Sequence, residues 1–190
     1  MAHSMSYNTC KTGDSSLCTG LRNTRITSMN MTKYAYLLAF FVISLLCACD
    51  SSRIFEENKE IVNGVWNVND TISFEVEIAD SAAPVNMYLN VRNAGMYQYE
   101  NLFMFITTTF PNGRTHKDTV ECILADQNGW LGDGLGEIFD NQILFRRRVT
   151  FPLNGKYIFS LEQAHRFGDE PFIENLPFII DVGMRIEYSK

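Results

Sequence analysis

The residues whose type and spacing point most directly to chemistry stand at the end of an apolar run. Residues 34–48 are almost entirely apolar, follow Lys33, and end in Leu46-Cys47-Ala48-Cys49. A short basic start, an apolar stretch of about 7–15 residues and small residues at its exit form a secretory signal. The chemistry that this arrangement predicts is lipidation of the Cys49 thiol together with cleavage behind Ala48, which makes Cys49 the new N-terminus.

This ending resembles the bacterial lipobox, in which a leucine stands three residues before the cysteine that becomes the lipid-bearing N-terminus. Only Cys49 fits that spacing, because processing at Cys47 would put Leu46 at the position of the small residue. The apolar run is also shorter than the roughly 20 residues that a membrane-spanning helix needs. An ordinary secretory peptide that ends at Ala48, or an uncleaved anchor, is the alternative to lipidation.

Lipidation at Cys49 removes the preceding residues from the fold. Residues 29–48 are then the lipoprotein signal peptide. Residues 1–28 are polar and without periodicity, and we interpret them as an extension outside the native protein, since Met29 or Met31 is the expected start.

Charge and cysteine content restrict the function of residues 49–190. They contain 12 basic and 21 acidic residues, a formal charge of −9. This acidity argues against nucleic-acid binding, which relies on dense Lys and Arg. Apart from Cys49 the only cysteine is Cys122, which alternates with Val120 and Leu124 and is expected to be a small buried hydrophobe.

The chain after the predicted lipidation site is organised as a tether and one domain. Residues 49–64 are polar and are expected to form a flexible tether. From residue 65 the pattern has a period of two, which predicts an all-β fold over 65–190. We expect a single antiparallel β-sandwich, jelly-roll or Ig-like, of about seven to eight strands. Expected strands cover 71–78, 85–92, 102–109, 115–124, 143–151, 156–161 and 178–187, and only 162–167 has a helical pattern.

No segment has the pattern of a catalytic or cofactor site. His116 and His165 lack a nearby nucleophile motif or a second histidine at ligand spacing. Residues 126–137 superficially follow a calcium loop, but Trp130 and Leu131 stand where an oxygen ligand and a glycine are required. We therefore predict no catalytic residue, no metal and no cofactor.

Three consecutive arginines stand out in this acidic chain. Strand alternation predicts that Arg146 and Arg148 share one face and that Arg147 lies on the other. Ion pairs with neighbouring carboxylates are the simplest interpretation. The functional interpretation is a docking point for an acidic partner or for lipid headgroups.

Tyr97, Tyr99 and Trp130 complete the candidate partner or ligand surface. Their rings are the right kind for an aromatic platform that binds sugars, whereas aromatic residues in a sandwich more commonly belong to the core.

Several segments of the predicted domain are familiar as a set. They are Val85–Asn93, Tyr97–Ile106, Asp118–Asp126, Gly129–Gly132 and Asp181–Glu187. With most of residues 60–188, these segments resemble the gliding-motility lipoprotein GldH family of Bacteroidota. The resemblance implies an envelope lipoprotein linked to gliding and to machinery that shares components with the type IX secretion system. It implies no catalytic residues and only one functional position, the lipidated cysteine, which corresponds to Cys49.

These observations together predict a non-enzymatic, lipid-anchored assembly or stability factor of the motility and secretion machinery. The expected partners are the membrane, through the lipid, and other envelope lipoproteins or motility and secretion proteins. Asp50 is followed by Ser51-Ser52-Arg53 and not by the acidic run that directs some such lipoproteins to the cell surface. This favours the outer membrane, facing the periplasm. A glycan-binding module is the main alternative, and a hydrolase would require a cleft with convergent catalytic groups.

Overall fold

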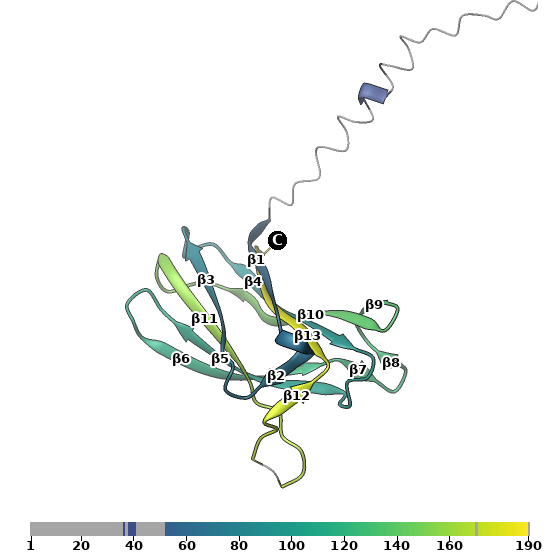
Figure 1. Ribbon diagram of the computed structural model, residues 1–190. Helices are drawn as coiled ribbons and strands as arrows, with labels where there is room; N and C mark the ends of the chain where they lie inside the picture. Colours follow the sequence, from purple (N-terminus) through teal and green to yellow (C-terminus); the bar gives the residue numbers. More distant parts are fainter. Residues whose placement is uncertain (1–35, 37, 41–51, 170, 190) are drawn as a thin grey trace, which may run out of the picture. The chain divides into compact units, whose positions relative to one another are not determined.

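The protein was analysed as a computed structural model (Figure 1), which describes Tyr36 and residues 38–40, 52–169 and 171–189. The chain divides into two compact units, Met1–Cys49 and Asp50–Lys190. In the first unit, Tyr36 and residues 38–40 are α-helical. Within the described part of the chain, no helix combines the length and the apolar character needed to cross a membrane.

The second unit is built from antiparallel strands in two larger and two smaller sheets. A single 3-10 turn, η1 (Val62–Gly64), follows the first strand. The five-stranded sheet has the order β1 (Arg53–Glu60), β13 (Ile179–Tyr188), β4 (Val85–Ala94), β10 (Ile138–Val149) and β9 (Asp133–Leu135). The four-stranded sheet has the order β3 (Ile72–Ile78), β11 (Gly155–Gln163), β5 (Asn101–Thr109) and β6 (Thr115–Ile123). The two-stranded sheets pair β12 (Asn175–Pro177) with β2 (Val65–Asn67), and β7 (Ala125–Asp126) with β8 (Gly129–Trp130).

Strict alternation along the long strands produces the core between the two larger sheets. Met87 and Leu89 of β4 and Phe74 of β3 belong to the same buried hydrophobic cluster. On each strand, the residues that alternate with these buried ones face outward. Trp66 of β2 is fully buried and closes one end of this cluster. Cys122 is also fully buried, which confirms the prediction, and burial raises the pKa of its thiol to about 12.

The predicted class is confirmed, but the predicted strand number is wrong. The fold is all-β and antiparallel, yet the described residues form 13 strands in four sheets instead of a single sandwich of seven to eight strands. Each of the seven strands expected from alternation is present. Five of the additional strands, β2, β7, β8, β9 and β12, have two or three residues, which is too short for a period of two to be recognised. No helix forms over 162–167, because β11 continues through Gln163.

The start of the domain also corrects the expectation of a tether over 49–64. Arg53–Glu60 is strand β1, which pairs antiparallel with β13 from Arg53↔Glu187 to Glu60↔Asp181. Edge strands are commonly rich in charged side chains, and backbone hydrogen bonds to one neighbour hold them in place. This composition explains why β1 resembles a linker in the sequence.

Gly183 is the position that allows β1 to approach β13 closely. A methyl group on Gly183 would lie 1.7 Å from Asn58 Oδ1 and 2.6 Å from the Glu57 carbonyl oxygen. The second of these atoms belongs to the backbone, so a side chain here requires β1 itself to move.

We therefore expect Gly183→Ala to destabilise the domain by about 1–3 kcal/mol, the usual cost of overpacking. Urea denaturation measures this loss. The double variant Gly183→Ala/Asn58→Ala relieves only the side-chain clash, so it should recover part of the stability and not all of it. A Gly183→Ala protein as stable as the parent would contradict this role for the glycine.

Candidate functional site

Polar side chains from four neighbouring strands meet on the outer face of the five-stranded sheet. The register places Asn58 of β1, Gly183 of β13, Asn90 of β4 and Gln142 of β10 in one row across the sheet. Because alternate residues of a strand face opposite sides, these side chains point away from the core. The same alternation that places apolar residues in the core therefore places polar residues on this outer face.

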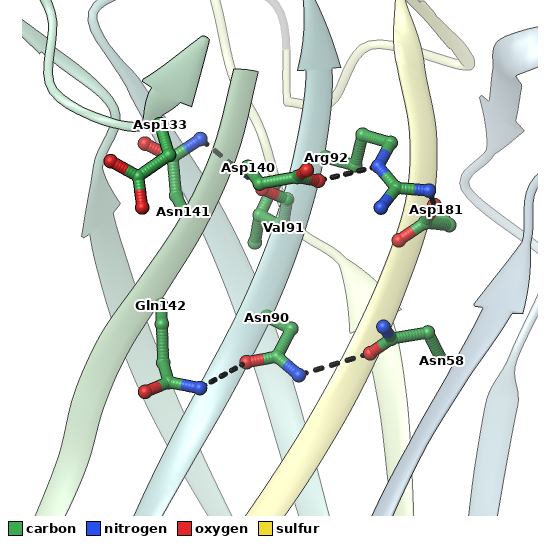
Figure 2. Close-up of a pocket in the computed structure, with 9 residues that line it drawn as sticks. All are labelled: Asn58, Asn90, Val91, Arg92, Asp133, Asp140, Asn141, Gln142 and Asp181. Carbon is green, nitrogen blue, oxygen red and sulfur yellow. Dashed lines mark hydrogen bonds and ion pairs between the residues drawn. The ribbon is translucent and has the colours of Figure 1, made fainter. Parts of the chain in front are cut away.

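The amides of this row bond to one another (Figure 2). Gln142 Nε2 donates to Asn90 Oδ1 at 3.3 Å, and Asn90 Nδ2 donates to Asn58 Oδ1 at 3.0 Å. Gly183 contributes no side chain, which leaves room for Asn58 above it. Among the described residues, the Asn58 amide nitrogen and the Gln142 amide oxygen have no protein partner. The row therefore ends in one donor and one acceptor available to a ligand.

A second polar group lies beside the amide row, centred on Arg92 of β4. Its Nε donates to Asp140 of β10, and its Nη1 donates to Asp181 of β13 at 2.8 Å (Figure 2). The bond to Asp140 raises the pKa of Arg92. Asp181 is buried, and burial raises the pKa of its carboxyl although Arg92 opposes that shift. Arg92 thus neutralises carboxylates from both neighbouring strands.

The two polar groups line a shallow hollow of about 310 Å³, which we call the sheet hollow. Asp133 of β9 lies at its edge, and a second depression adjoins it across β10 and shares Asp133, Asp140 and Gln142. The side chains that line the sheet hollow are amides, carboxylates, one guanidinium and one valine. Such groups exchange hydrogen bonds with hydroxyls, amides or peptide groups. This chemistry suits recognition of a polar surface.

A buried amide pair supports the hollow from beneath. Asn141 Nδ2 donates to Asn93 Oδ1 at 2.9 Å and to the Val91 carbonyl oxygen at 3.1 Å. Both asparagines are buried, at 7% and 0% exposure, so these bonds satisfy groups that water does not reach. They fix β10 against β4 and hold the polar face in register.

Replacing Arg92 tests how far the hollow depends on this cation. We expect Arg92→Met to destabilise the domain by about 1–3 kcal/mol at neutral pH, because the buried Asp181 carboxylate loses its charged donor. Protonated Asp181 does not need the cation. The raised pKa of Asp181 means that its protonated form favours the folded state at low pH and that this contribution is lost as the pH rises.

Urea denaturation at neutral pH and near pH 4 measures the effect, and the difference between the variant and the parent should be smaller at the lower pH. Glu75→Gln removes a carboxylate from an exposed ion pair with Lys156 and serves as the control. An equal loss at both pH values would contradict the role of Asp181.

The fold brings the three aromatic residues of the predicted surface together, mainly because their rings pack against one another and against the core. The ring centroids of Tyr97 and Tyr99 are 5.5 Å apart, and those of Tyr97 and Trp130 are 6.4 Å apart. Tyr97 is 4% exposed, donates its hydroxyl to the Asn101 carbonyl oxygen at 2.9 Å, and has a pKa raised by burial. Tyr99 and Trp130 are partly buried against the core. The three rings do not lie in the sheet hollow.

His165 lies inside the same aromatic cluster. It is 2% exposed, its ring centroid is 4.2 Å from that of Tyr99, and its Nδ1 atom has no hydrogen-bond partner among the described residues. Burial lowers the pKa of the imidazole. Burial therefore favours the neutral form of the ring.

This environment predicts a pH-dependent stability. Because the folded pKa of His165 lies below its unfolded value of about 6.5, the unfolded chain binds a proton first as the pH falls. The free energy of unfolding should be level above that pH and should decrease below it. His165→Phe keeps a ring in the cluster and should remove this part of the slope in urea denaturation. Equal slopes would contradict the prediction.

The predicted arginines lie at the far end of β10 from the sheet hollow. Arg146 Nη2 is 2.7 Å from Asp118 Oδ1, and its guanidinium lies 4.8 Å from the Phe145 ring centroid. The regular alternation from which the faces of the arginines were predicted is interrupted, because β10 has register shifts on either side of Arg146 and Arg148 has a φ of 50°. Cys49, the predicted lipidation site, lies outside the described residues, as do nearly all residues of the predicted signal peptide and all of 1–28.

The residues of the sheet hollow were not singled out by the sequence. A signal was present, because Asn90, Arg92 and Asp181 occupy the polar positions of alternating strands within segments that carry the family resemblance. Which polar positions meet depends on strand order, which spacing does not give. Among the described residues, no group of three or more His, Cys, Asp or Glu has an arrangement that could hold a metal ion.

The family model and the known proteins that match this chain all point to the same family. The family model described as GldH lipoprotein matches residues 53–186. A gliding motility lipoprotein GldH homolog of Christiangramia forsetii is 35% identical over 158 residues, covering 82% of this chain and 96% of that protein. The gliding motility lipoprotein GldH of Flavobacterium johnsoniae is 35% identical over 145 residues, covering 75% of this chain and 89% of that protein.

Solved structures give only a distant likeness. The match to a structure of TmCBM61 in complex with β-1,4-galactotriose covers 71% of this chain and 88% of that chain, with 10% identity and a TM-score of 0.28. The match to the infectious bursal disease virus VP2 subviral particle covers 74% of this chain and 34% of that chain, with 15% identity and a TM-score of 0.32. At these scores neither likeness bears on function.

Proposed function

Because the chain belongs to the GldH lipoprotein family, we propose that it is a non-enzymatic assembly or stability factor of the gliding-motility machinery. Membership makes it a lipoprotein related to gliding motility and anchored at a membrane of the cell envelope. In this proposal the lipid is carried by Cys49. The domain faces the periplasm from the outer membrane, and its partners are other envelope lipoproteins or motility and secretion proteins.

The observation that carries this proposal is the sheet hollow. Its charged groups are already engaged, since Arg92 bonds to Asp140 and Asp181, so they favour holding a surface over moving protons. The amide row still offers a donor at Asn58 and an acceptor at Gln142. A polar depression with directed hydrogen-bonding groups is suited to the rim and centre of a protein contact.

A glycan-binding module is a second candidate, and the same amide row favours it. Amide and carboxylate side chains are suitable partners for sugar hydroxyls. Against it, no aromatic ring lines the sheet hollow, so a sugar bound there would lack a stacking surface.

Deletion of the gene, followed by complementation with variants, tests the proposed function. We expect loss of the protein to lower the amounts of other envelope lipoproteins or of motility and secretion proteins, measured by quantitative mass spectrometry of envelope fractions. The parent gene should restore these amounts. Cys49→Ala should fail to restore them, because the protein no longer reaches its membrane.

Variants of the hollow separate recognition from anchoring. Asn90→Ala/Gln142→Ala removes the centre of the amide row and should restore the partner proteins poorly while itself being present in the envelope. Glu75→Ala/Lys156→Ala removes an exposed ion pair on the other sheet and is the matched control. Unchanged amounts of all envelope proteins after deletion would refute the assembly role. If Asn90→Ala/Gln142→Ala loses binding to a glycan while the amounts of envelope proteins stay unchanged, the second candidate is favoured.

A further inference from the structure

The start of β1 and the end of the chain lie at the same end of the sandwich. Ser52 accepts a hydrogen bond from the Tyr188 backbone at 2.8 Å, and Arg53 pairs with Glu187. Tyr188 in turn pairs with Val85, the first residue of β4. Figure 1 shows β1 beginning beside β13 and β4 at this end. The chain that leads back to Cys49 therefore leaves from here.

Loops of both sheets complete this end. The Phe151 backbone donates to the Ser81 carbonyl oxygen at 3.1 Å, which joins the loop after β3 to the loop after β10. A Cβ on Gly155 would lie 3.3 Å from Pro111, so the turn between β5 and β6 is adjacent. Because β10 pairs with β4 at Val149↔Val85, the arginines at the end of β10 belong to the same end.

This end is basic although the domain is acidic. We call it the basic end and define it by Arg114, His116, Arg146, Arg147 and Arg148, all of which are exposed. Among the residues that the structure describes, the side chains of Arg114, Arg147 and Arg148 form no ion pair, and Arg146 is paired with Asp118. Two exposed carboxylates that form no ion pair among the described residues, Glu77 and Asp80, also lie at this end, so the three unpaired arginines outnumber them by one.

The backbone of β10 is distorted in a way that exposes all three consecutive arginines. In a regular strand, alternate side chains face opposite sides, so one of three neighbours would turn inward. Register shifts flank Arg146, and Arg148 adopts a left-handed φ of 50°, held by a hydrogen bond from its backbone N–H to Asn86 Oδ1 at 3.0 Å. Such strain is uncommon for a residue with a side chain and is associated with functional sites.

Apolar side chains accompany these cations. Leu153 is 37% exposed and Tyr188 is 42% exposed at the same end. Phe110, Leu153, Arg114 and His116 line a depression of about 450 Å³. Basic groups interspersed with a tyrosine and a leucine are typical of protein surfaces that meet the headgroup region of a bilayer.

Chain length limits how far this end can stand from an anchor at Cys49. Three residues, 50–52, separate Cys49 from the first residue of β1. At about 3.3–3.6 Å per residue, even an extended chain holds the start of β1 within about 14 Å of the acylated cysteine. A flexible linker of 16 residues would have allowed any face to meet the membrane, whereas this short one does not.

We propose that the basic end lies on the membrane surface and that Arg114, Arg146, Arg147 and Arg148 bind the phosphates of anionic lipid headgroups. This inference rests on the lipid attachment that is part of the proposed function. The lipid limits the distance between the domain and the bilayer, and the arginines determine which end of the domain faces it. Anionic headgroups attract basic residues near the surface over about one Debye length.

Hydrogen exchange of the lipidated protein in vesicles tests this orientation. The mature protein is reconstituted into vesicles of phosphatidylcholine alone or with about 30% phosphatidylglycerol. Backbone amides of 110–116 and 146–154 should exchange about 5–10-fold more slowly in the anionic vesicles, whereas those of the 164–169 loop should not change. The slower exchange should disappear at high salt.

Charge-matched variants identify the residues responsible. Arg147→Gln/Arg148→Gln should lose most of the protection in anionic vesicles, whereas Lys59→Gln/Arg166→Gln removes the same charge away from the basic end and should retain it. Circular dichroism and thermal unfolding show that both variants are folded. Protection that persists without the arginines would overturn the inference, as would protection that requires an added acidic protein instead of anionic lipid.

The outcomes also separate this inference from the proposed function. Absence of acyl groups on Cys49 by mass spectrometry, with no flotation on vesicles, would refute the lipid anchor and the orientation together. A lipidated protein that floats with both kinds of vesicle but exchanges equally in each would refute the orientation and leave the anchor intact.

Discussion

The pairing of β1 with β13 is the constraint on which the rest of the domain depends. It joins Arg53–Glu60, which begins four residues after the predicted lipidation site, to the C-terminal strand at one edge of the five-stranded sheet. Gly183 permits this approach, because Asn58 and the Glu57 carbonyl occupy the space that a side chain would need. The same pairing carries Asn58 to within hydrogen-bonding distance of Asn90. The position of the start of the domain and the amide row of the hollow therefore have one structural origin.

The sequence was informative where a strand has one face in the core. Alternation over seven or more residues identified β3, β4 and β13, since each position between the sheets must be apolar and each outer position is free to be polar. The same rule fails for β1, an edge strand with only partial burial, and for strands of two or three residues. Backbone pairing alone defines those elements, and it leaves no period in the side chains.

The site was less accessible to prediction than the fold, for a different reason. Arg92 and Asp181 are 89 positions apart, and Arg92 and Asp140 are 48 apart, yet they meet because the strand order is β13-β4-β10. Spacing along a chain gives the face of each residue but not its neighbours across the sheet. The aromatic residues that were singled out do meet, but Tyr97 is buried by the packing that brings it there. The bulges around Arg146 likewise depend on pairing with β4, so the sequence did not reveal that regular alternation is interrupted along the arginines.

The two proposals together specify a geometry for partner binding. The long strands of the five-stranded sheet start or end at the basic end, where Tyr188, Val85 and Val149 are aligned. If that end rests on the bilayer, the strands lead away from the membrane, and their outer face, with the sheet hollow, looks along the surface. Asn90 lies midway along β4, so a protein bound there stands beside the domain and not above it. A partner anchored in the same membrane meets this requirement with little loss of freedom, because both proteins are already confined to one surface.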